Sequence, residues 1–195
     1  MRVKSILAGA VLGVVTAVQA VQVDPTGSNQ PVPLVDKLLL AQVTAAARNG
    51  DAKSQLILGD AYLLGDGGLA KSPGEAMALY QKAASQGYTP AQRRLGYVYS
   101  KGDGIERDDA MALHWYRAAA ELGDSHAQRI VGLMYGIQRN KQEAYFWSLL
   151  ATRNGNKDAM RARDYDEAQL TQPERAAVRA RVAKWRPKKN ETPSR

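Results

Sequence analysis

One short pattern recurs three times in this chain of 195 residues, at almost constant spacing. Gly59, Gly96 and Gly132 lie 37 and 36 residues apart, and a tyrosine follows each of them three residues later. A second pattern follows each glycine, with alanines flanking a leucine or a tryptophan: Ala76/Leu79/Ala83, Ala112/Trp115/Ala119 and Ala144/Trp147/Ala151. Self-similarity at a fixed period of about 20–50 residues is typical of arrays whose units pack on their neighbours.

Each unit predicts two helices. In residues 91–99 and again in residues 109–122, apolar side chains recur at helical spacing and form one stripe. Gly102-Asp103-Gly104 separates the two stripes, and glycine permits the left-handed backbone of a helix end and tight turn. Candidate helix caps are Ser72 with Glu75, Asp108, Asn140 and Thr89-Pro90. The chain is therefore expected to be all-α, an α/α solenoid of about three helix–turn–helix repeats with helical caps at both ends.

The repeat glycines fall in the middle of predicted helices, where glycine costs about 1 kcal/mol relative to alanine. We therefore expect a second helix to pack closely against each one, with Ala83 and Ala119 facing Gly59 and Gly96. Aromatic side chains are expected to fill the space in and between the units: Tyr62, Tyr99, Trp115, Tyr116, Tyr135 and Trp147. The alternative is that these aromatic residues form a ligand-binding box.

The two ends of the chain differ from the repeats. Arg2 and Lys4 precede an apolar run of 13 residues from Ile6 to Val18, which predicts a signal peptide over residues 1–20, cleaved after Ala20. The alternative is an uncleaved membrane anchor. Residues 21–33 are predicted to be a linker, residues 34–187 the solenoid, and residues 188–195 a basic disordered tail. Helices over residues 38–49 and about 159–186 would cap the array.

Composition narrows the function classes. The chain has no cysteine, which excludes disulfides, thiolate catalysis and Cys-ligated metals. After residue 20 the charge is +6, because 25 basic residues face 19 acidic ones, and residues 160–195 account for +5 of it. The body of the chain is thus close to neutral, which argues against nucleic acid as a partner. An anionic glycan or a membrane surface remains a candidate partner for the basic C-terminal segment.

These residues resemble the Sel1-like repeats, which are related to tetratricopeptide repeats, over about residues 38–187. The family pattern is roughly A-x-x-x-L-G-x-x-Y-x-x-G-x-G, then A-x-x-W-Y-x-x-A-A-x-x-G. The second unit matches it nearly throughout. The first unit has an extra Gly68 and has Leu79-Tyr80 in place of Trp-Tyr. The third unit lacks the Gly-x-Gly loop and has Ser148 and Thr152 at the tyrosine and alanine positions.

The resemblance implies a binding face on the concave side of the array. By similarity with tetratricopeptide repeats, its residues lie three before each repeat glycine and one and four after it. They are Leu56, Asp60, Leu63, Arg93, Tyr97, Ser100, Arg129, Leu133 and Gly136. Tyr97 between Arg93 and Arg129 would suit a peptide carboxylate or an acidic segment. The alternative is an ordinary solvated helix face.

Three functional hypotheses follow. The first is a secreted, periplasmic adaptor or scaffold that binds a protein in the cell envelope without catalysis. The second is an accessory protein associated with an envelope polysaccharide or peptidoglycan. The third, an enzyme, is disfavoured because His114 and His126 lie in no recognisable catalytic motif, and no phosphate loop or EF-hand is present. No cofactor and no metal are expected.

Overall fold

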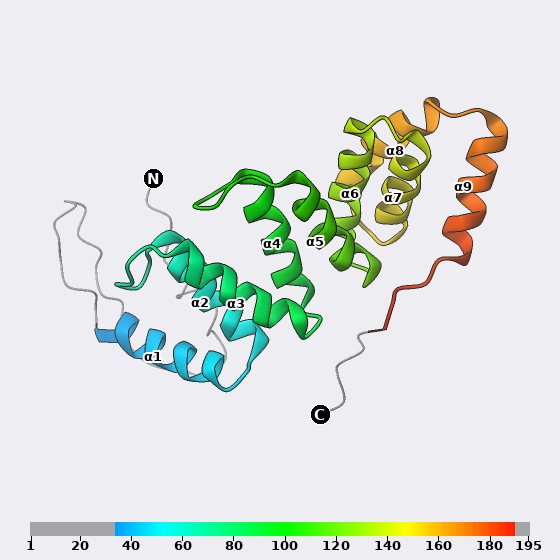
Figure 1. Ribbon diagram of the computed structural model, residues 1–195. Helices are drawn as coiled ribbons and strands as arrows, with labels where there is room; N and C mark the ends of the chain where they lie inside the picture. Colours follow the sequence, from blue (N-terminus) through cyan, green and yellow to red (C-terminus); the bar gives the residue numbers. More distant parts are fainter. Residues whose placement is uncertain (1–33, 190–195) are drawn as a thin grey trace. The chain divides into compact units, whose positions relative to one another are not determined.

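The computed structural model describes residues 34–189, and side chains from Lys37 onward. This part of the chain is helical and contains no strand, which confirms the predicted all-α repeat solenoid (Figure 1). Its elements are α1 (Leu34–Arg48), α2 (Ala52–Leu64), α3 (Pro73–Ser85), α4 (Thr89–Lys101), α5 (Asp109–Glu121), α6 (Ser125–Ile137), α7 (Lys141–Arg153), the 3-10 turn η2 (Lys157–Ala159), α8 (Met160–Ala168) and α9 (Gln172–Lys184). The predicted signal peptide and linker lie outside the described residues.

The helices form two compact units, which divide between Ala83 and Ala84. In the first unit, Val43 and Ala47 of α1 pack with Leu58 of α2, and partly buried side chains, Tyr62 and Leu79 among them, surround this cluster. Tyr80 is fully buried, and its hydroxyl donates a hydrogen bond to Asp60 Oδ1 at 2.7 Å. The alanines and tyrosines of the repeat pattern therefore lie in the interior of this unit.

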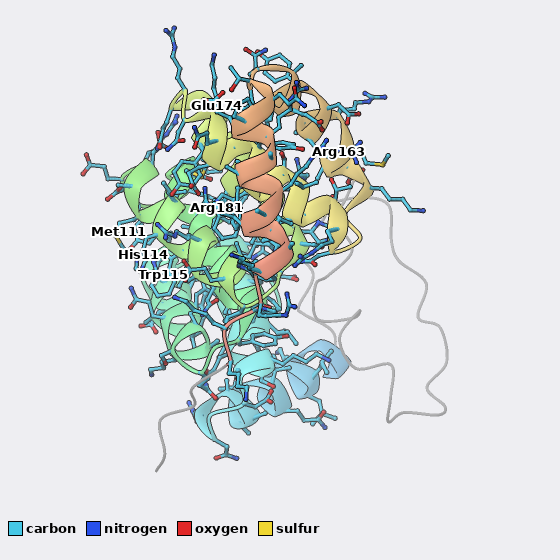
Figure 2. All side chains as sticks on the ribbon, turned by 90° about the vertical axis from the view of Figure 1, so that its right-hand side faces the viewer. Met111, His114, Trp115, Arg163, Glu174 and Arg181 are labelled. Atoms are coloured by element: carbon cyan, nitrogen blue, oxygen red, sulfur yellow. The ribbon has the colours of Figure 1, made fainter. Side chains whose placement is uncertain are left out.

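The core of the second unit runs through α5, α6, α7 and α9. Its buried members are Ala112, Tyr116, Ala119, Ala120, Ala127, Val131, Tyr145, Phe146, Trp147, Leu150, Leu170, Val178 and Val182. Figure 2 looks onto α9, and Arg181, which it labels, lies in the last turn of that helix. Arg181 pairs with Glu143 at 2.7 Å and lies over the ring of Phe146. Helix α9 thus covers the third repeat, in the capping role that a solenoid end requires.

The close packing at the repeat glycines is confirmed, but the groups that face them differ from the prediction. A Cβ on Gly96 would lie 2.8 Å from Cγ of Tyr116, and one on Gly59 would lie 2.5 Å from Cε1 of Tyr80. Tyrosine rings, rather than Ala83 and Ala119, cover these two glycines. At Gly132 the nearest atom would be the backbone nitrogen of Ser148, at 3.1 Å. Serine replaces the tyrosine there, so the backbone of α7 itself lies against the glycine.

Short acidic and amide side chains begin four of the helices, α2, α5, α6 and α7. The predicted caps Asp108 and Asn140 accept hydrogen bonds from first-turn amides of α5 and α7, and Thr171 forms a capping box with Glu174 at α9. Thr89 is not a cap as predicted, because it is already the first residue of α4 and Tyr88 precedes it without a side-chain cap bond. Asp51 and Asp124 cap α2 and α6, at 2.7 and 2.8 Å from the amides of Ser54 and Ala127.

A buried glutamine joins each first helix to the end of the helix before it. Gln55, Gln92 and Gln128 donate Nε2 hydrogen bonds to the carbonyl oxygens of Ala47, Ala84 and Ala120, at 3.1, 3.2 and 3.0 Å. Each acceptor lies eight residues before its donor. These bonds use carbonyl groups in the last turn of a helix, which have no partner within that helix.

The chain after α9 returns to α5. Pro187 lies beside Gly123, and the backbone amide of Lys188 donates to the carbonyl oxygen of Glu121 at 2.8 Å. The ammonium of Lys188 pairs with the Glu121 carboxylate at 2.5 Å. The predicted tail therefore has its first residue in contact with the second repeat, because this residue supplies two bonds to α5. Residues 190–195 of the predicted tail lie outside the described residues.

Candidate functional site

The predicted binding face has one part in each compact unit, and the part on α2 is mostly interior. Asp60 is 7% exposed and Leu63 is 4% exposed, whereas Leu56 is half-buried. Asp60 accepts the hydrogen bond of the buried Tyr80 hydroxyl, and the apolar side chain of Leu63 is removed from water. Neither side chain is available to a partner in this structure, so the offset rule taken from tetratricopeptide repeats does not place an exposed face on α2.

In the second unit, Arg93 of α4 is held by Asp124. Its guanidinium lies 3.2 Å from Asp124 Oδ2, and the same carboxylate caps α6 through its other oxygen. The pair therefore joins the start of α6 to the preceding first helix. An arginine in such a bond is a positioning group first, because any anionic ligand would compete with an ion pair already formed.

Arg129 and Ser100 are also partly internal. The Nε of Arg129 is buried and forms no hydrogen bond within the described residues. Ser100 donates to the carbonyl oxygen of Tyr97 at 2.8 Å, and a hydrogen bond also links its side chain to Tyr116. Burial raises the pKa of Tyr116, while the bond to Ser100 acts in the opposite direction. Ser100 therefore stabilises the fold around the ring that covers Gly96.

Two large apolar side chains of the predicted face remain exposed. Tyr97 on α4 is 42% exposed and Leu133 on α6 is 44% exposed. Ile137, one helical turn after Leu133, is 84% exposed and was not among the predicted positions. The exposure of Ile137 could have been predicted from its spacing, because Leu133, Gly136 and Ile137 lie on one side of α6. The structure thus leaves three large apolar side chains exposed on α4 and α6, Tyr97, Leu133 and Ile137, which we call the apolar face.

The groups that catalysis or metal binding would use do not gather at this face. The described part of the chain contains no group of three or more His, Asp or Glu side chains placed to hold a metal ion. His114, labelled in Figure 2, is exposed on α5, and its ring lies edge-on to that of Trp115 with ring centroids 5.2 Å apart. His126 is exposed near the start of α6. Over residues 34–189, no helix has the length and apolar character needed to cross a membrane.

Comparison with known families identifies the repeats. The model of the Sel1 repeat matches residues 52–88, 89–124 and 125–156. These ranges correspond to the helix pairs α2–α3, α4–α5 and α6–α7, each with the turn that follows it. More than half of the chain is therefore covered by matched repeats.

Curated relatives share this region of the chain. The chain is 29% identical over 153 residues to chitin synthase regulatory factor 4 of Schizosaccharomyces pombe. The aligned region covers 78% of this chain and 24% of the relative. The chain is 36% identical over 92 residues to protein sel-1 homolog 2 of Mus musculus, covering 47% of this chain and 13% of the relative. The chain thus spans about a quarter or less of the length of these two relatives.

A solved structure has the same architecture. The Sel1 repeat protein from Oxalobacter formigenes superimposes with a TM-score of 0.62 at 27% sequence identity, covering 76% of this chain and 64% of that one. The likeness supports the helical repeat fold described above.

Proposed function

This chain belongs to the Sel1 repeat family, and on that basis we propose that it is a non-catalytic adaptor that binds another protein in the cell envelope. Sel1 repeat proteins mediate protein–protein interactions. The relative named above, chitin synthase regulatory factor 4, carries the name of a regulator, which supports a role in controlling or placing another protein.

The observation that carries the proposal is the apolar face on α4 and α6. Isolated exposed apolar residues are common on protein surfaces, but interface centres are enriched in tyrosine and in other large apolar side chains. Tyr97 and Leu133 occupy corresponding first helices of adjacent repeats, one residue after the repeat glycine in each case. A partner covering both would bury an aromatic and an aliphatic anchor, the usual centre of a binding hot spot.

The cellular location is part of the proposal. The positive residues and the apolar run before Val18 support secretion, with cleavage after Ala20 and a mature chain in the periplasm. Terminal sequencing of the protein purified from its host tests this step. A mature chain beginning at Val21 supports it, whereas a chain that retains residues 1–20 supports a membrane anchor and contradicts release.

The binding test uses the full chain with a C-terminal tag, expressed in its host and recovered from envelope extract. The variant Tyr97→Ala/Leu133→Ala removes both anchors without touching the Arg93–Asp124 pair. Leu64→Ala is the matched control, because Leu64 is also exposed but lies at the end of α2. One protein captured by the wild type and by the control, and lost with the double variant, supports the adaptor. Equal capture by all three proteins contradicts the assignment of the face.

The second candidate is an accessory protein that binds an anionic envelope polysaccharide or peptidoglycan. The observation that favours it is the charge of +5 carried by residues 160–195. Electrostatic binding to a polyanion weakens steeply as the salt concentration rises, whereas binding through an apolar protein interface depends much less on salt. Sedimentation with purified peptidoglycan at low and high salt separates the two. Salt-sensitive retention that survives Tyr97→Ala/Leu133→Ala supports this second candidate.

A further inference from the structure

A cavity of about 300 Å³ lies beside the turn that joins α6 to α7. Its walls come from the end of α6, the turn, the start of α7 and helix α8: Gly136, Arg139, Lys141, Ala144, Tyr165, Asp166 and Gln169. All of these elements belong to the second compact unit. The volume is at the lower end of the range for ligand pockets, about 300–1,000 Å³, and so suits a chain end or a small molecule.

The cavity adjoins the place where the third repeat departs from the other two. Gly132 and Ala144 are 12 residues apart, against 16 for Gly96 and Ala112 in the second repeat. The connection is reduced to Gln138, Arg139 and Asn140, and it lacks the glycine-rich loop of the earlier repeats. The turn therefore presents side chains at the cavity in the third repeat without a loop beside them.

Arg139 is unusual in both backbone and side chain. Its φ of 59° makes it the one described residue other than glycine with a positive φ. An L-residue in this left-handed region is strained, and such strain is often found at binding sites. The Arg139 side chain forms no hydrogen bond or ion pair within residues 34–189, and Lys141 forms no ion pair there, although its charge helps to lower the pKa of Glu174. Two cations that line the cavity are thus available to an anion.

Asp166, on α8, brings a hydrogen-bond acceptor to the same cavity. It is 8% exposed, and its carboxyl group is hydrogen-bonded to Ser148. Burial raises the pKa of Asp166, and the bond to Ser148 partly offsets this. A carboxyl group has more acceptor positions than one hydroxyl fills, so Asp166 can accept a further N–H from a ligand in the cavity. The remaining lining residues include the 68% exposed Tyr165 and Ala144, which is 1% exposed and whose methyl group lies close to Gly136.

We propose that this cavity binds the C-terminal end of a partner polypeptide with an apolar last residue. The terminal carboxylate would lie against Arg139 and Lys141, the last backbone N–H would donate to Asp166, and the last side chain would pack on the exposed ring of Tyr165. A C-terminal residue carries these three groups on adjacent atoms, which matches a cavity with two cations, one acceptor and an apolar wall. An internal acidic side chain carries its carboxylate further from its own N–H. The site does not depend on the apolar face of α4 and α6.

The test uses the labelled full chain and two libraries of random heptapeptides on beads, anchored at the N-terminus. One library ends in free carboxylates and the other in amides. We expect enrichment only from the first library, with apolar last residues. The best sequence, remade in solution, should bind at least tenfold more tightly than its own amide. No enrichment above beads without peptide, or equal affinity for acid and amide, overturns the proposal.

Arg139→Gly is the decisive variant, since glycine adopts a φ of 59° without strain and the fold is expected to persist. Its affinity for the selected peptide should fall at least tenfold, and Arg139→Lys should recover part of the loss. Wild-type affinity in Arg139→Gly contradicts the site.

Tyr97→Ala/Leu133→Ala should bind the peptide as the wild type does. Loss of the peptide in that variant overturns this site in favour of the α4–α6 face. Loss of the captured protein alone concerns only the proposed adaptor function.

Discussion

In the second repeat the ring of Tyr116 covers Gly96, whereas in the third repeat Gly132 faces the backbone of α7 at Ser148. Both glycines occupy the same place in the sequence pattern, but one makes room for a side chain and the other for a helix. The second helix of the third repeat has lost its ring, and its backbone has taken the space. The comparison shows that one repeated glycine can meet two packing requirements.

The two repeats also end their first helices differently. Gly102, with a φ of 71°, ends α4 and leads into a loop whose Asp108 amide donates to the Tyr99 carbonyl oxygen. In the third repeat the left-handed position falls on Arg139. The second repeat therefore uses glycine where backbone strain would arise, and the third places a charged side chain there, beside a cavity.

The largest expected effect is from Gly96→Leu. A Cβ at this position would already lie 2.8–2.9 Å from three atoms of the Tyr116 ring. Overpacking usually costs about 1–3 kcal/mol, and we expect about 3 kcal/mol or more here because the ring cannot move within a filled interior. The melting temperature should fall by about 2–4 °C per kcal/mol. Lys101→Leu, on the exposed side of α4, is the control and should leave the melting temperature nearly unchanged. An equal shift in the two variants would contradict the packing of Tyr116 against Gly96.

The next largest effect is that of Gly96→Ala on the free energy of unfolding, which should have opposite signs in the wild type and in the variant Tyr116→Ser. In the wild type, Gly96→Ala is expected to lower the free energy of unfolding by about 1–2 kcal/mol through contact with Tyr116. In Tyr116→Ser, which imitates the third repeat, the same change should raise it by about 1 kcal/mol, because alanine favours the helix and fills vacated space. Urea unfolding of the four proteins measures the coupling. Destabilisation in both backgrounds would show that the ring is not the obstacle.

The buried glutamines should differ between the repeats by a smaller amount. Gln128 bonds through both ends, since its Oε1 accepts from Asn154 Nδ2 at 2.9 Å, whereas Oε1 of Gln92 has no partner within the described residues. Gln128→Leu should lower the free energy of unfolding by about 2 kcal/mol and Gln92→Leu by about 1 kcal/mol, because the first change removes two hydrogen bonds and the second removes one, at about 0.5–1.5 kcal/mol each. Urea unfolding decides the order. The reverse order would contradict the hydrogen-bond assignment.

The smallest expected effect is a stabilisation of the fold by Arg139→Gly. Arg139→Gly should raise the free energy of unfolding by up to about 1 kcal/mol, since it removes left-handed strain of about 1–2 kcal/mol and adds glycine entropy in the unfolded chain. Gln138→Gly is the matched control at a φ of −74° and should lower it by about 1 kcal/mol. Chemical denaturation compares the pair. Destabilisation by Arg139→Gly would mean that the arginine side chain supports the turn.

The period and chemistry of the repeats made the helices and two of their caps, Asp108 and Asn140, predictable, whereas the caps Asp51 and Asp124 were not predicted. Apolar spacing showed which side of each helix is interior, and the replacement of tyrosine by Ser148 was visible in the sequence. The partner of each glycine was not predictable, because spacing along a helix does not say which residue of the next helix lies opposite. Tyr116 and Ala119 both face inward, and only the packing distinguishes them.

The candidate face was predictable only in part. Tyr97 and Leu133 are exposed as a fixed offset from the glycine predicts, but Asp60 and Leu63 at the corresponding offsets are buried. The offset rule assumes that every repeat exposes the same side, and the bond from Tyr80 to Asp60 breaks that assumption. The cavity at Arg139 could not be predicted from the sequence, because part of its wall comes from α8, which lies outside the repeat pattern.

The return of the chain to α5 bears on how the array loses its structure. An array of nearest-neighbour contacts can fray from its free end, one repeat at a time. Here the Lys188 amide is bonded to the Glu121 carbonyl oxygen, so the last described segment of the chain is attached to the repeat before the last one. The third repeat lies between these two points of the chain and cannot open alone without releasing the Lys188 bond. We therefore expect amide exchange in α6, α7 and α9 to proceed through a shared opening, with no gradient of protection toward the C-terminus.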